Sequence, residues 1–510
     1  MKVVLVYLES FWTRTDGGED RYRCVRLSAD GALGIGCLRA FAEADPALAR
    51  RVELRTLLIP DGGSDAQAAA EILRGAPDLV GFTCTLWNSE RVRRVCDALG
   101  ARGRKPLVVL GGPDIPRDSA ALSALLAGIP AADFLVRGEG EIAFRDLLRA
   151  LLRKKAPVSV PGLAFRQGDG VVVGPPAAPV VELGDIPAPY ASGALSIRPG
   201  AMGMLTLETA RGCPFRCSYC DYHAGRHRVR RFPPERLRRD LEAVRRSGFQ
   251  GCVYLTDPSL NAARDRGAAV FRLLRDLPNP VHMELTPGDF TPGSIRAIAA
   301  MAAPSLAIGI QSTSPEALAA VGRPCDLRKS ARNIAALLSH PNVSVELELL
   351  LGLPGESYAS FRGSIDWVLS FSPRRPHLTV FDLVLLPNSP LASSRGDFGL
   401  EADAAGLVTG CRGFPERDLA RASWLVAAYS HLRSDPERWS AFERAAGASA
   451  RRPSALLEDE VRRLRAEGRI PDIRVVGQGG RRLADWAPRV HRWIESRAAG
   501  EDVGTYPRWW

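Results

Sequence analysis

Three cysteines stand close together near the middle of the chain, in the segment CPFRCSYC. Cys213, Cys217 and Cys220 follow a C-x3-C-x2-C spacing, and Tyr219 directly precedes the third cysteine. Thiolates at short, fixed spacings ligate iron–sulfur clusters, and three of them can hold three corners of a 4Fe–4S cube. The motif offers no ligand for the fourth iron, which leaves an open position of the kind that distinguishes a catalytic metal centre from a structural one. The spacing therefore predicts a cluster that takes part in chemistry.

Two other interpretations account for these cysteines less well. A structural zinc site prefers four ligands arranged as two separated pairs, and here His223 or His227 would have to supply the fourth. A disulfide framework is disfavoured because the 510 residues contain only ten cysteines and the N-terminus does not read as a secretory signal.

The first 155 residues alternate short apolar runs with helical patterns. This alternation predicts βαβ units and a doubly wound, Rossmann-like parallel sheet in an α/β fold. The expected strands are Val3–Tyr7, Val52–Leu58, Leu79–Thr83, Leu107–Leu110 and Phe134–Val136. Ligands of such sheets bind at the carboxyl ends of the strands, where this sequence places glycine-rich or polar turns.

Three further regions follow along the chain. Residues 156–200 predict a linker that contains a hairpin turning at residues 168–170. Residues 201–395 predict a partial (β/α)6 barrel, with the cysteine segment after its first strand. The expected barrel strands are Leu205–Thr209, Gly251–Thr256, Val281–Leu285, Leu306–Gln311, Val343–Leu350 and Leu378–Leu385. Residues 396–510 predict a mostly helical, aromatic-rich segment with a β-like interruption at Ile473–Val476, which we expect to cap the substrate site.

The cysteine motif resembles the signature of radical S-adenosylmethionine (SAM) enzymes. The segments LVGFTCTLWN, VVLGGPDI and FLVRGEGE resemble the cobalamin-binding domain that precedes many such enzymes. ELGDIPAPY is similar to the linker of that family, and LAIGIQSTSPEALAAVGRP, ELLLGLPGES and FDLVLLPNSPL are similar to later parts of its barrel. The resemblance covers about residues 1–395 and implies the fold of cobalamin-dependent radical SAM methyltransferases.

The resemblance also implies roles for particular residues. It gives the cluster to Cys213, Cys217 and Cys220, with SAM completing the fourth iron. Residues expected to contact SAM or the substrate are Tyr219, Asp257, Glu284, Gln311, Glu348 and Leu353. Residues expected to contact cobalamin are Thr83, Leu86, Trp87, Asn88, Gly111, Gly112, Pro113, Glu139 and Gly140. For Glu284, Gln311 and Glu348 an ordinary buried hydrogen-bond network is the competing interpretation, and for Trp87 it is core packing.

The positions of the histidines bear on how cobalamin would bind. All seven lie at or after position 223, so the N-terminal region contains none. Some cobalamin domains use a D-x-H-x-x-G loop whose histidine ligates cobalt from below, and this region cannot do so. We therefore expect the lower face of the cofactor to meet water, an apolar wall or a side chain from residues 26–36.

Composition sets wider limits. A hydrophobic content of 46% and a charged content of 25% are ordinary for a globular protein, and no apolar run reaches the roughly 18 residues of a membrane span. The net charge of +11 is densest at residues 226–239, where a solvated helix face explains it without nucleic acid. These features, with an oxygen-sensitive cluster, predict a protein of the reducing cytoplasm with no membrane partner.

The resulting hypothesis is an enzyme that moves a methyl group from SAM through methylcobalamin to an unactivated carbon. A small molecule or peptide precursor of a natural product is the expected substrate, with the indole of tryptophan as one concrete candidate. A flavodoxin or ferredoxin is the expected electron donor. A non-methylating rearrangement or cyclisation, an RNA modification, and a cobalamin-responsive binding or regulatory module with a vestigial barrel remain open as alternatives.

Overall fold

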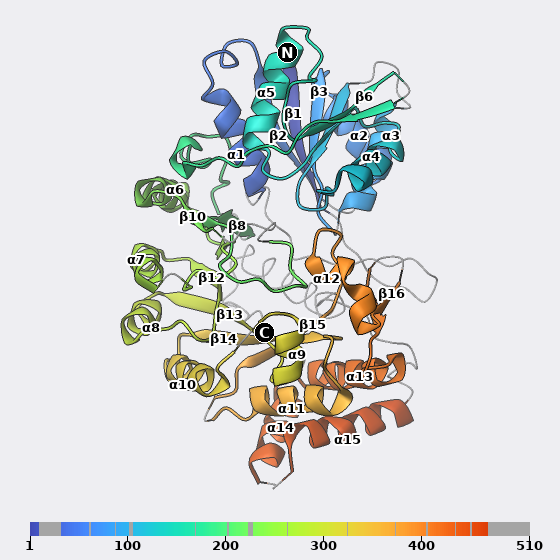
Figure 1. The fold of residues 1–510 in the computed structure, drawn as a ribbon. Helices are drawn as coiled ribbons and strands as arrows, with labels where there is room; N and C mark the ends of the chain where they lie inside the picture. Colours follow the sequence, from blue (N-terminus) through green and yellow to red (C-terminus); the bar gives the residue numbers. More distant parts are fainter. Residues whose placement is uncertain are drawn as a thin grey trace. The chain divides into compact units, whose positions relative to one another are not determined.

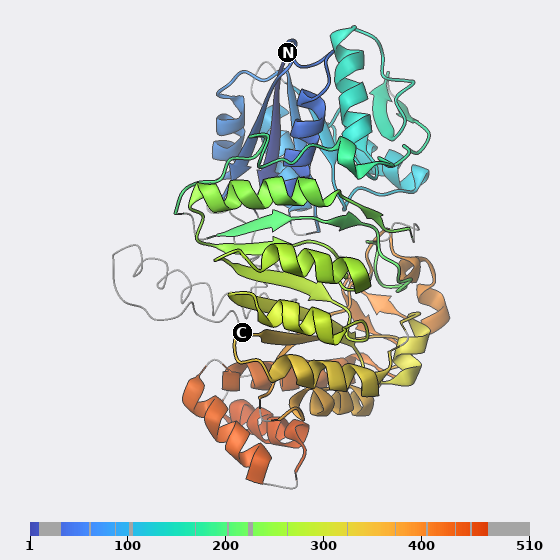
Figure 2. The same ribbon diagram turned by 90° about the vertical axis from the view of Figure 1, so that its left-hand side faces the viewer.

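The structure is a computed structural model. It describes residues 1–9, 32–60, 63–86, 88–100, 106–168, 170–200, 203–222, 228–262, 264–323, 325–372, 374–403, 406–433, 435–448 and 451–467. The chain separates into two compact units (Figures 1 and 2). Unit 1 comprises residues 1–211 and 229–256, and unit 2 comprises residues 212–228 and 257–510.

Unit 1 is built on a seven-stranded sheet in the order β2-β1-β3-β4-β5-β6-β7. The first five strands run parallel to one another, as the alternating pattern predicts. Their bounds are β1 Lys2–Leu8, β2 Glu53–Ile59, β3 Leu79–Thr83, β4 Leu107–Gly111 and β5 Phe134–Val136. Each of the five predicted strands is confirmed to within about a residue at either end.

Helices cover both faces of this sheet, which is why its strands are apolar on both sides. On one face, α1 (Leu33–Glu43) and α5 (Glu141–Leu152) pack over side chains such as Leu5 of β1. On the other face, α2 (Asp65–Leu73), α3 (Ser89–Gly100) and α4 (Ser119–Ala127) pack over the alternate residues of the same strands. Two buried cores result, and the doubly wound prediction is confirmed.

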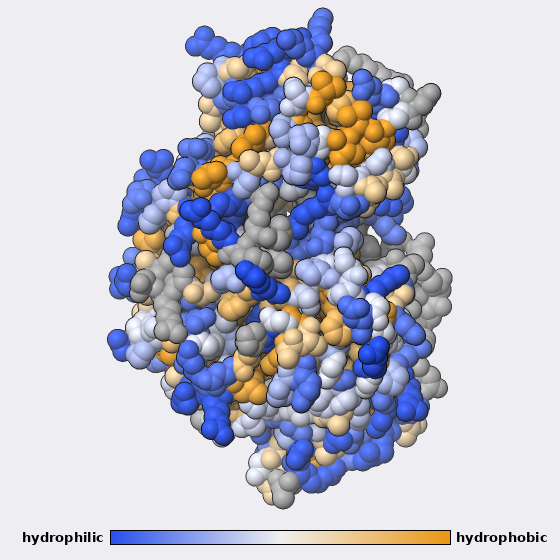
Figure 3. All heavy atoms as spheres, in the orientation of Figure 1, coloured by the Kyte–Doolittle hydropathy of each residue, from blue (hydrophilic) through white to orange (hydrophobic). Residues whose placement is uncertain are grey.

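The hairpin predicted around residue 168 belongs to this sheet. Strand β6 (Leu163–Gln167) pairs antiparallel with β5, and β7 (Gly170–Val173) pairs antiparallel with β6. A segment expected to link two domains thus adds two strands to the first one. Side chains of β7 are partly exposed at this edge, and apolar atoms gather over the region of the hairpin (Figure 3).

The remainder of unit 1 contains short strands and one long helix. Strands β8 (Met204–Leu207) and β11 (Cys252–Leu255) pair in parallel. Strands β9 (Ala210–Arg211) and β10 (Arg230–Arg231) form a two-stranded antiparallel ribbon. Helix α6 (Pro234–Ser247) follows the ribbon and ends at Gly248, whose φ of 70° gives a left-handed C-cap.

Unit 2 carries four parallel strands that pair in sequence order. They are β12 Pro280–Leu285, β13 Ala303–Gln311, β14 Ser344–Leu351 and β15 His377–Asp382. The helices between and after them are α7 Arg264–Leu274, α8 Pro292–Ala299, α9 Pro315–Ala320, α10 Leu327–Leu338 and α11 Tyr358–Leu369. In β14 buried residues alternate strictly with partly exposed ones, so one face packs under helices while the other carries Glu346 and Glu348.

The last described part of unit 2 is mostly helical, as predicted. It holds α12 Pro390–Ser393, β16 Glu401–Ala402, β17 Val408–Gly410, α13 Glu416–Arg433, α14 Pro436–Ala448 and α15 Pro453–Ala466. Tyr429 and Trp439 are buried against each other, with ring centroids 5.6 Å apart. The predicted β-like run Ile473–Val476 lies outside the described residues. Within them, no helix has the length and apolarity needed to cross a bilayer.

Candidate functional site

A cavity of about 240 Å³ lies in unit 1 between the sheet and helices α1 and α5. Six of the nine residues predicted to contact cobalamin line it, and they come from the ends of β3, β4 and β5. They are Thr83, Gly111, Gly112, Pro113, Glu139 and Gly140. This location is the one that parallel sheets offer to ligands.

Glycines keep the walls of this cavity open. A Cβ atom built on Gly34 or Gly138 would meet nothing within 4 Å, so a side chain at either position would project into free space. At Gly112 the reason for glycine is different, because φ is +110° and a Cβ would lie 2.5 Å from the carbonyl oxygen of Cys84. The backbone that follows β4 therefore lies so close to the backbone that follows the neighbouring strand β3 that only glycine fits at position 112.

The other predicted cobalamin contacts differ from these six. Asn88 is fully buried, and its amide is engaged in holding the chain between β3 and α3. Its Oδ1 accepts a hydrogen bond from the Thr85 amide at 2.7 Å, and its Nδ2 donates to the carbonyls of Leu8 and Thr83 at 3.1 and 3.0 Å. Neither Asn88 nor Leu86 is among the described residues that line the cavity, and Trp87 lies outside the described residues.

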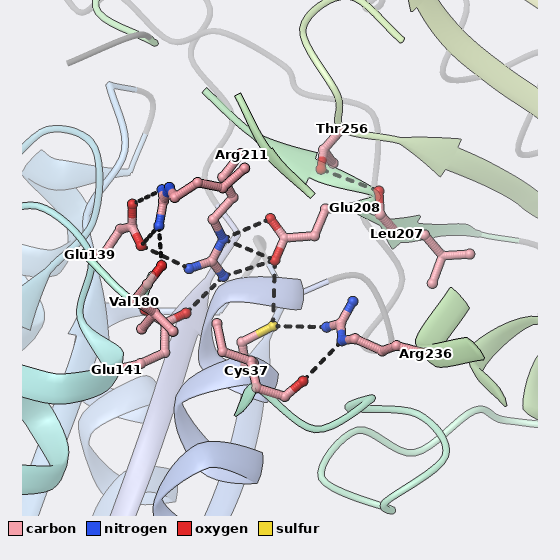
Figure 4. A network of polar contacts seen from close by, with 11 residues as sticks. Cys37, Glu139, Glu141, Val180, Leu207, Glu208, Arg211, Arg236 and Thr256 are labelled. Carbon is pink, nitrogen blue, oxygen red and sulfur yellow. Dashed lines mark hydrogen bonds and ion pairs between the residues drawn. The ribbon is translucent and has the colours of Figure 1, made fainter. Parts of the chain in front are cut away.

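Figure 4 shows a network of charged side chains, of which Glu139, Glu141 and Arg211 line the cavity. Arg211 lines the cavity and contacts three carboxylates: Glu208 at 2.8 Å, Glu141 at 2.7 Å and Glu139 at 3.4 Å. Burial works against the charge of Arg211, but Glu208 and Glu141 outweigh it and hold its pKa well above the usual range. The guanidinium is therefore a fixed positive charge beside the cavity.

The same network reaches a buried thiol. Cys37 of α1 lies 3.8 Å from Oε1 of Glu208 and 3.7 Å from Nη2 of Arg236. Burial, followed by the charge of Glu208, raises the pKa of this thiol far above its usual range. Cys37 is therefore an unreactive part of the packing, in line with its lack of ligand-like spacing in the sequence.

In unit 2 the three cysteines of the motif are free thiols with different surroundings. Cys217 is buried, whereas Cys213 and Cys220 are partly exposed. Burial raises the pKa of Cys213, and it raises that of Cys220 to about 11. Burial thus favours the protonated form of Cys213 and Cys220 without metal, and iron has to displace these protons on binding. The Tyr222 amide donates to Sγ of Cys220 at 3.4 Å.

Arg323 is the cationic partner of this loop. Its Nη1 donates to Sγ of Cys217 at 3.4 Å, and its Nη2 donates to the carbonyl of Gly309 at 2.6 Å. Tyr219 lies within the same group and shares a side-chain hydrogen bond with Cys217. Burial raises the pKa of this phenol well above its usual range, so it stays neutral and donates.

The remaining predicted contacts lie at strand ends or on the polar face of the unit 2 sheet. Asp257 is buried two residues after β11. Gln311 ends β13 with a φ of 69°, at a register shift against β14. Burial, and then the charges of Glu284 and Glu346, raise the pKa of Glu348 well above its usual range. Leu353 is buried, and its carbonyl accepts a hydrogen bond from Cys411 at 3.7 Å.

Sequence reasoning missed three charged residues of these two sites: Glu141, Arg211 and Arg323. Arg211 stands two residues before Cys213, and this short spacing could have indicated that it belongs near the cysteine motif. Arg323 lies 106 residues from the cysteine it contacts, so no local pattern could indicate the pairing.

Comparison with known protein families identifies both regions. Residues 207–368 match the radical SAM superfamily, and residues 33–148 match the B12 binding domain. The chain therefore carries a B12-binding domain and a radical SAM domain. These domains imply a 4Fe–4S cluster, SAM and cobalamin as cofactors.

Curated relatives and solved structures agree with this assignment. A cobalamin-dependent radical SAM methyltransferase, TokK of Streptomyces tokunonensis, is 29% identical over 377 residues, covering 70% of this chain and 54% of TokK. A 2-(S-pantetheinyl)-carbapenam-3-carboxylate methyltransferase of Streptantibioticus cattleyicolor is 28% identical with the same coverage. The chain thus spans about half the length of the curated relatives it matches.

Two solved structures share the fold. TsrM from Kitasatospora setae, a radical S-adenosylmethionine methyltransferase, superposes with a TM-score of 0.60 at 18% identity over 78% of this chain and 74% of its own. OxsB, a cobalamin-dependent S-adenosylmethionine radical enzyme, superposes with a TM-score of 0.63 at 14% identity over 98% of this chain and 80% of its own.

The residues present fit the implied cofactors. Within the described residues, no three Cys, His, Asp or Glu side chains converge on a position for a single metal ion. The three free thiols of the motif are the donor set of an iron–sulfur cluster, in which each would ligate a different iron. Open space beside Gly34 and Gly138 gives the B12-binding domain a recess that side chains would otherwise fill.

Proposed function

We propose that this chain, which joins a B12-binding domain to a radical SAM domain, is a cobalamin-dependent radical SAM methyltransferase. One observation carries the proposal: a single chain holds both a glycine-walled cavity at the strand ends of the first domain and three free, neighbouring thiols in the second. When bound, the cluster with SAM would supply one-electron chemistry that activates an inert carbon, and cobalamin would carry the methyl group.

The roles of this chain's own residues follow from their surroundings. Cys213, Cys217 and Cys220 would hold the cluster, and Arg323 would keep a positive charge beside Cys217. Asp257 would bind the amino group of SAM, as the resemblance implies. Glu348 would be neutral in the site, because burial, and then the charges of Glu284 and Glu346, disfavour its ionised form.

For the substrate we propose a small molecule or a peptide on the way to a natural product. The 29% and 28% identical relatives support this class, since one of them is named for a carbapenam carboxylate. A thioether-substituted carbapenam and free tryptophan are therefore the first two substrates to test. We place the enzyme in the reducing cytoplasm with a flavodoxin or ferredoxin as its reductant, which suits the nine free cysteines among the described residues.

The deciding experiment is anaerobic reconstitution with iron, sulfide and cobalamin, followed by addition of SAM and a chemical reductant. Formation of both 5′-deoxyadenosine and S-adenosylhomocysteine, with a product 14 mass units heavier than an added substrate (one CH₂), supports radical methylation. S-adenosylhomocysteine without 5′-deoxyadenosine would indicate a polar methyl transfer. Failure to bind cobalamin would overturn the proposal, and 5′-deoxyadenosine with an unmethylated, rearranged product would assign a different reaction.

A further inference from the structure

We propose that Glu139 is a positioning residue that couples the ligand of the cavity in unit 1 to the neck of the cysteine loop. The neck is the β9–β10 ribbon, whose strands directly precede and follow residues 212–229. The inference rests on the proposed function, because it takes the ligand of the cavity to be cobalamin and that of the loop to be the cluster.

The contacts on the neck side are specific. Arg211 and Arg230 face each other as register partners in the ribbon. Both bind the same carboxylate: Nη1 of Arg211 lies 3.4 Å from Oε2 of Glu139, and Nη1 of Arg230 donates to that oxygen at 3.0 Å. Nη2 of Arg230 also pairs with Oε1 of Glu139. One side chain therefore holds both ends of the cysteine loop.

On the cavity side, Glu139 stands in a turn whose residues form the wall. Gly138, Glu139 and Gly140 all line the cavity. Gly138 has a φ of +78° and open space beside it, while a Cβ on Gly140 would press on Leu38 of α1 at 3.0 Å. A ligand that fills the recess must contact this turn, and the position of the turn sets the position of the Glu139 carboxylate.

The two arginines depend on Glu139 to different extents. Arg211 keeps Glu141 and Glu208 as partners when the charge of Glu139 is removed. Arg230 pairs with Glu139 and also donates to the carbonyl of Val180. Both guanidinium side chains are only 15% exposed, so an ion pair lost here is poorly replaced by water. Neutralising Glu139 should therefore loosen the β10 side of the neck first.

Such a connection has a thermodynamic consequence that can be measured. If cobalamin fixes the turn and the turn fixes the neck, cobalamin raises the affinity of the loop for its cluster. By linkage, the cluster must then raise the affinity for cobalamin by the same factor. Removing a residue that only stabilises the fold would weaken cobalamin binding by the same factor with and without the cluster. The ratio of these two affinities would then stay the same.

The experiment measures the Kd of hydroxocobalamin by anaerobic absorbance titration, on the full-length protein with and without its reconstituted cluster. We expect the cluster to lower the Kd of the wild-type protein at least about fivefold, the lower end of typical couplings. Glu139→Gln should still bind cobalamin, with a ratio of the two Kd values close to one. Asp45→Asn is the matched control, because it removes a buried carboxylate that pairs with Arg149 in the same unit, and it should keep the wild-type ratio.

Each outcome decides the question. Equal Kd values in the two wild-type forms, or an unchanged ratio in Glu139→Gln, would overturn the coupling and leave the proposed function standing. Wild-type protein that binds no cobalamin in either form, or assembles no cluster, would overturn the proposed function and the coupling with it. If Glu139→Gln does not fold, Arg230→Gln breaks the same contact from the neck side and takes its place.

Discussion

Arg323 should tune the reduction potential of the cluster. Its guanidinium donates to Sγ of Cys217 at 3.4 Å and is anchored on the carbonyl of Gly309. Reduction adds negative charge to the cluster and its thiolates, and a nearby positive charge stabilises that charge. The change Arg323→Gln removes the positive charge and should therefore lower the midpoint potential.

The size of the shift follows from the geometry. Two unit charges 3.4 Å apart interact by about 5 kcal/mol at an effective dielectric constant of about 20. The added electron is shared over a cube with four irons, so about a quarter of it falls near Cys217, which leaves about 1.3 kcal/mol. That energy is roughly tenfold in the equilibrium between the oxidised and reduced forms, or about 60 mV for a one-electron couple.

The assay is an anaerobic redox titration followed by electron paramagnetic resonance of the reduced cluster. Arg323→Lys keeps the charge without the planar donor and should fall between the wild type and Arg323→Gln. Arg374→Gln is the control, because Arg374 also belongs to unit 2 and donates to the backbone carbonyls of His340 and Pro341. A potential in Arg323→Gln that equals the wild type or lies above it, with iron content intact, would refute the reasoning.

Three further predictions follow from single residues. Gly34→Ala should raise the melting temperature slightly, because alanine favours helix α1 by up to about 1 kcal/mol. The same change should weaken cobalamin binding, because the new methyl group enters open space at the cavity wall. Calorimetry and a cobalamin titration on one sample test both effects, and unchanged binding would contradict the prediction. Asn88→Ala should lower the free energy of unfolding by about 3 kcal/mol, since it removes three hydrogen bonds worth about 1 kcal/mol each. The affinity for cobalamin should not change. A variant that keeps its stability but binds cobalamin weakly would instead identify Asn88 as a direct contact. Burial raises the pKa of Glu356 from 4.5 to about 7, so between these pH values the folded state holds a proton that the unfolded state has lost. The free energy of unfolding should therefore fall by about 3 kcal/mol as pH rises from about 4.5 to 7. Glu356→Gln should remove this part of the pH dependence in denaturant titrations, and an unchanged dependence of the free energy of unfolding on pH would refute the assignment.

The longer parallel strands of both units were predictable because each one is a short apolar run bounded by turn residues, whereas the short strands β9, β10, β16 and β17 were not predicted. The cysteine loop was equally evident, since its three cysteines lie within eight residues. What escaped prediction depends on contacts between distant segments. The carboxylates that surround Arg211 include Glu139 and Glu141, which lie 72 and 70 residues away.

Asn88 and Gln311 show two further features that the sequence pattern alone does not reveal. Asn88 follows a strand end, as a ligand contact would, but its amide donates to the carbonyls of Leu8 and Thr83. Position in the sequence could not distinguish these two uses of one polar side chain. Gln311 was expected at a strand end and is found there, but its left-handed backbone, with a φ of 69°, has no signal in the sequence.

The β9–β10 ribbon bears on how the protein would be matured and repaired. It joins residues 211 and 230, and so closes the segment that carries the three thiols. Closing a chain of about 18 residues costs roughly 2.6 kcal/mol of chain entropy, and the pairing of β9 with β10 within unit 1 offsets that cost without iron. An enzyme whose cluster is lost to oxygen should therefore accept new iron and sulfide in place, without unfolding.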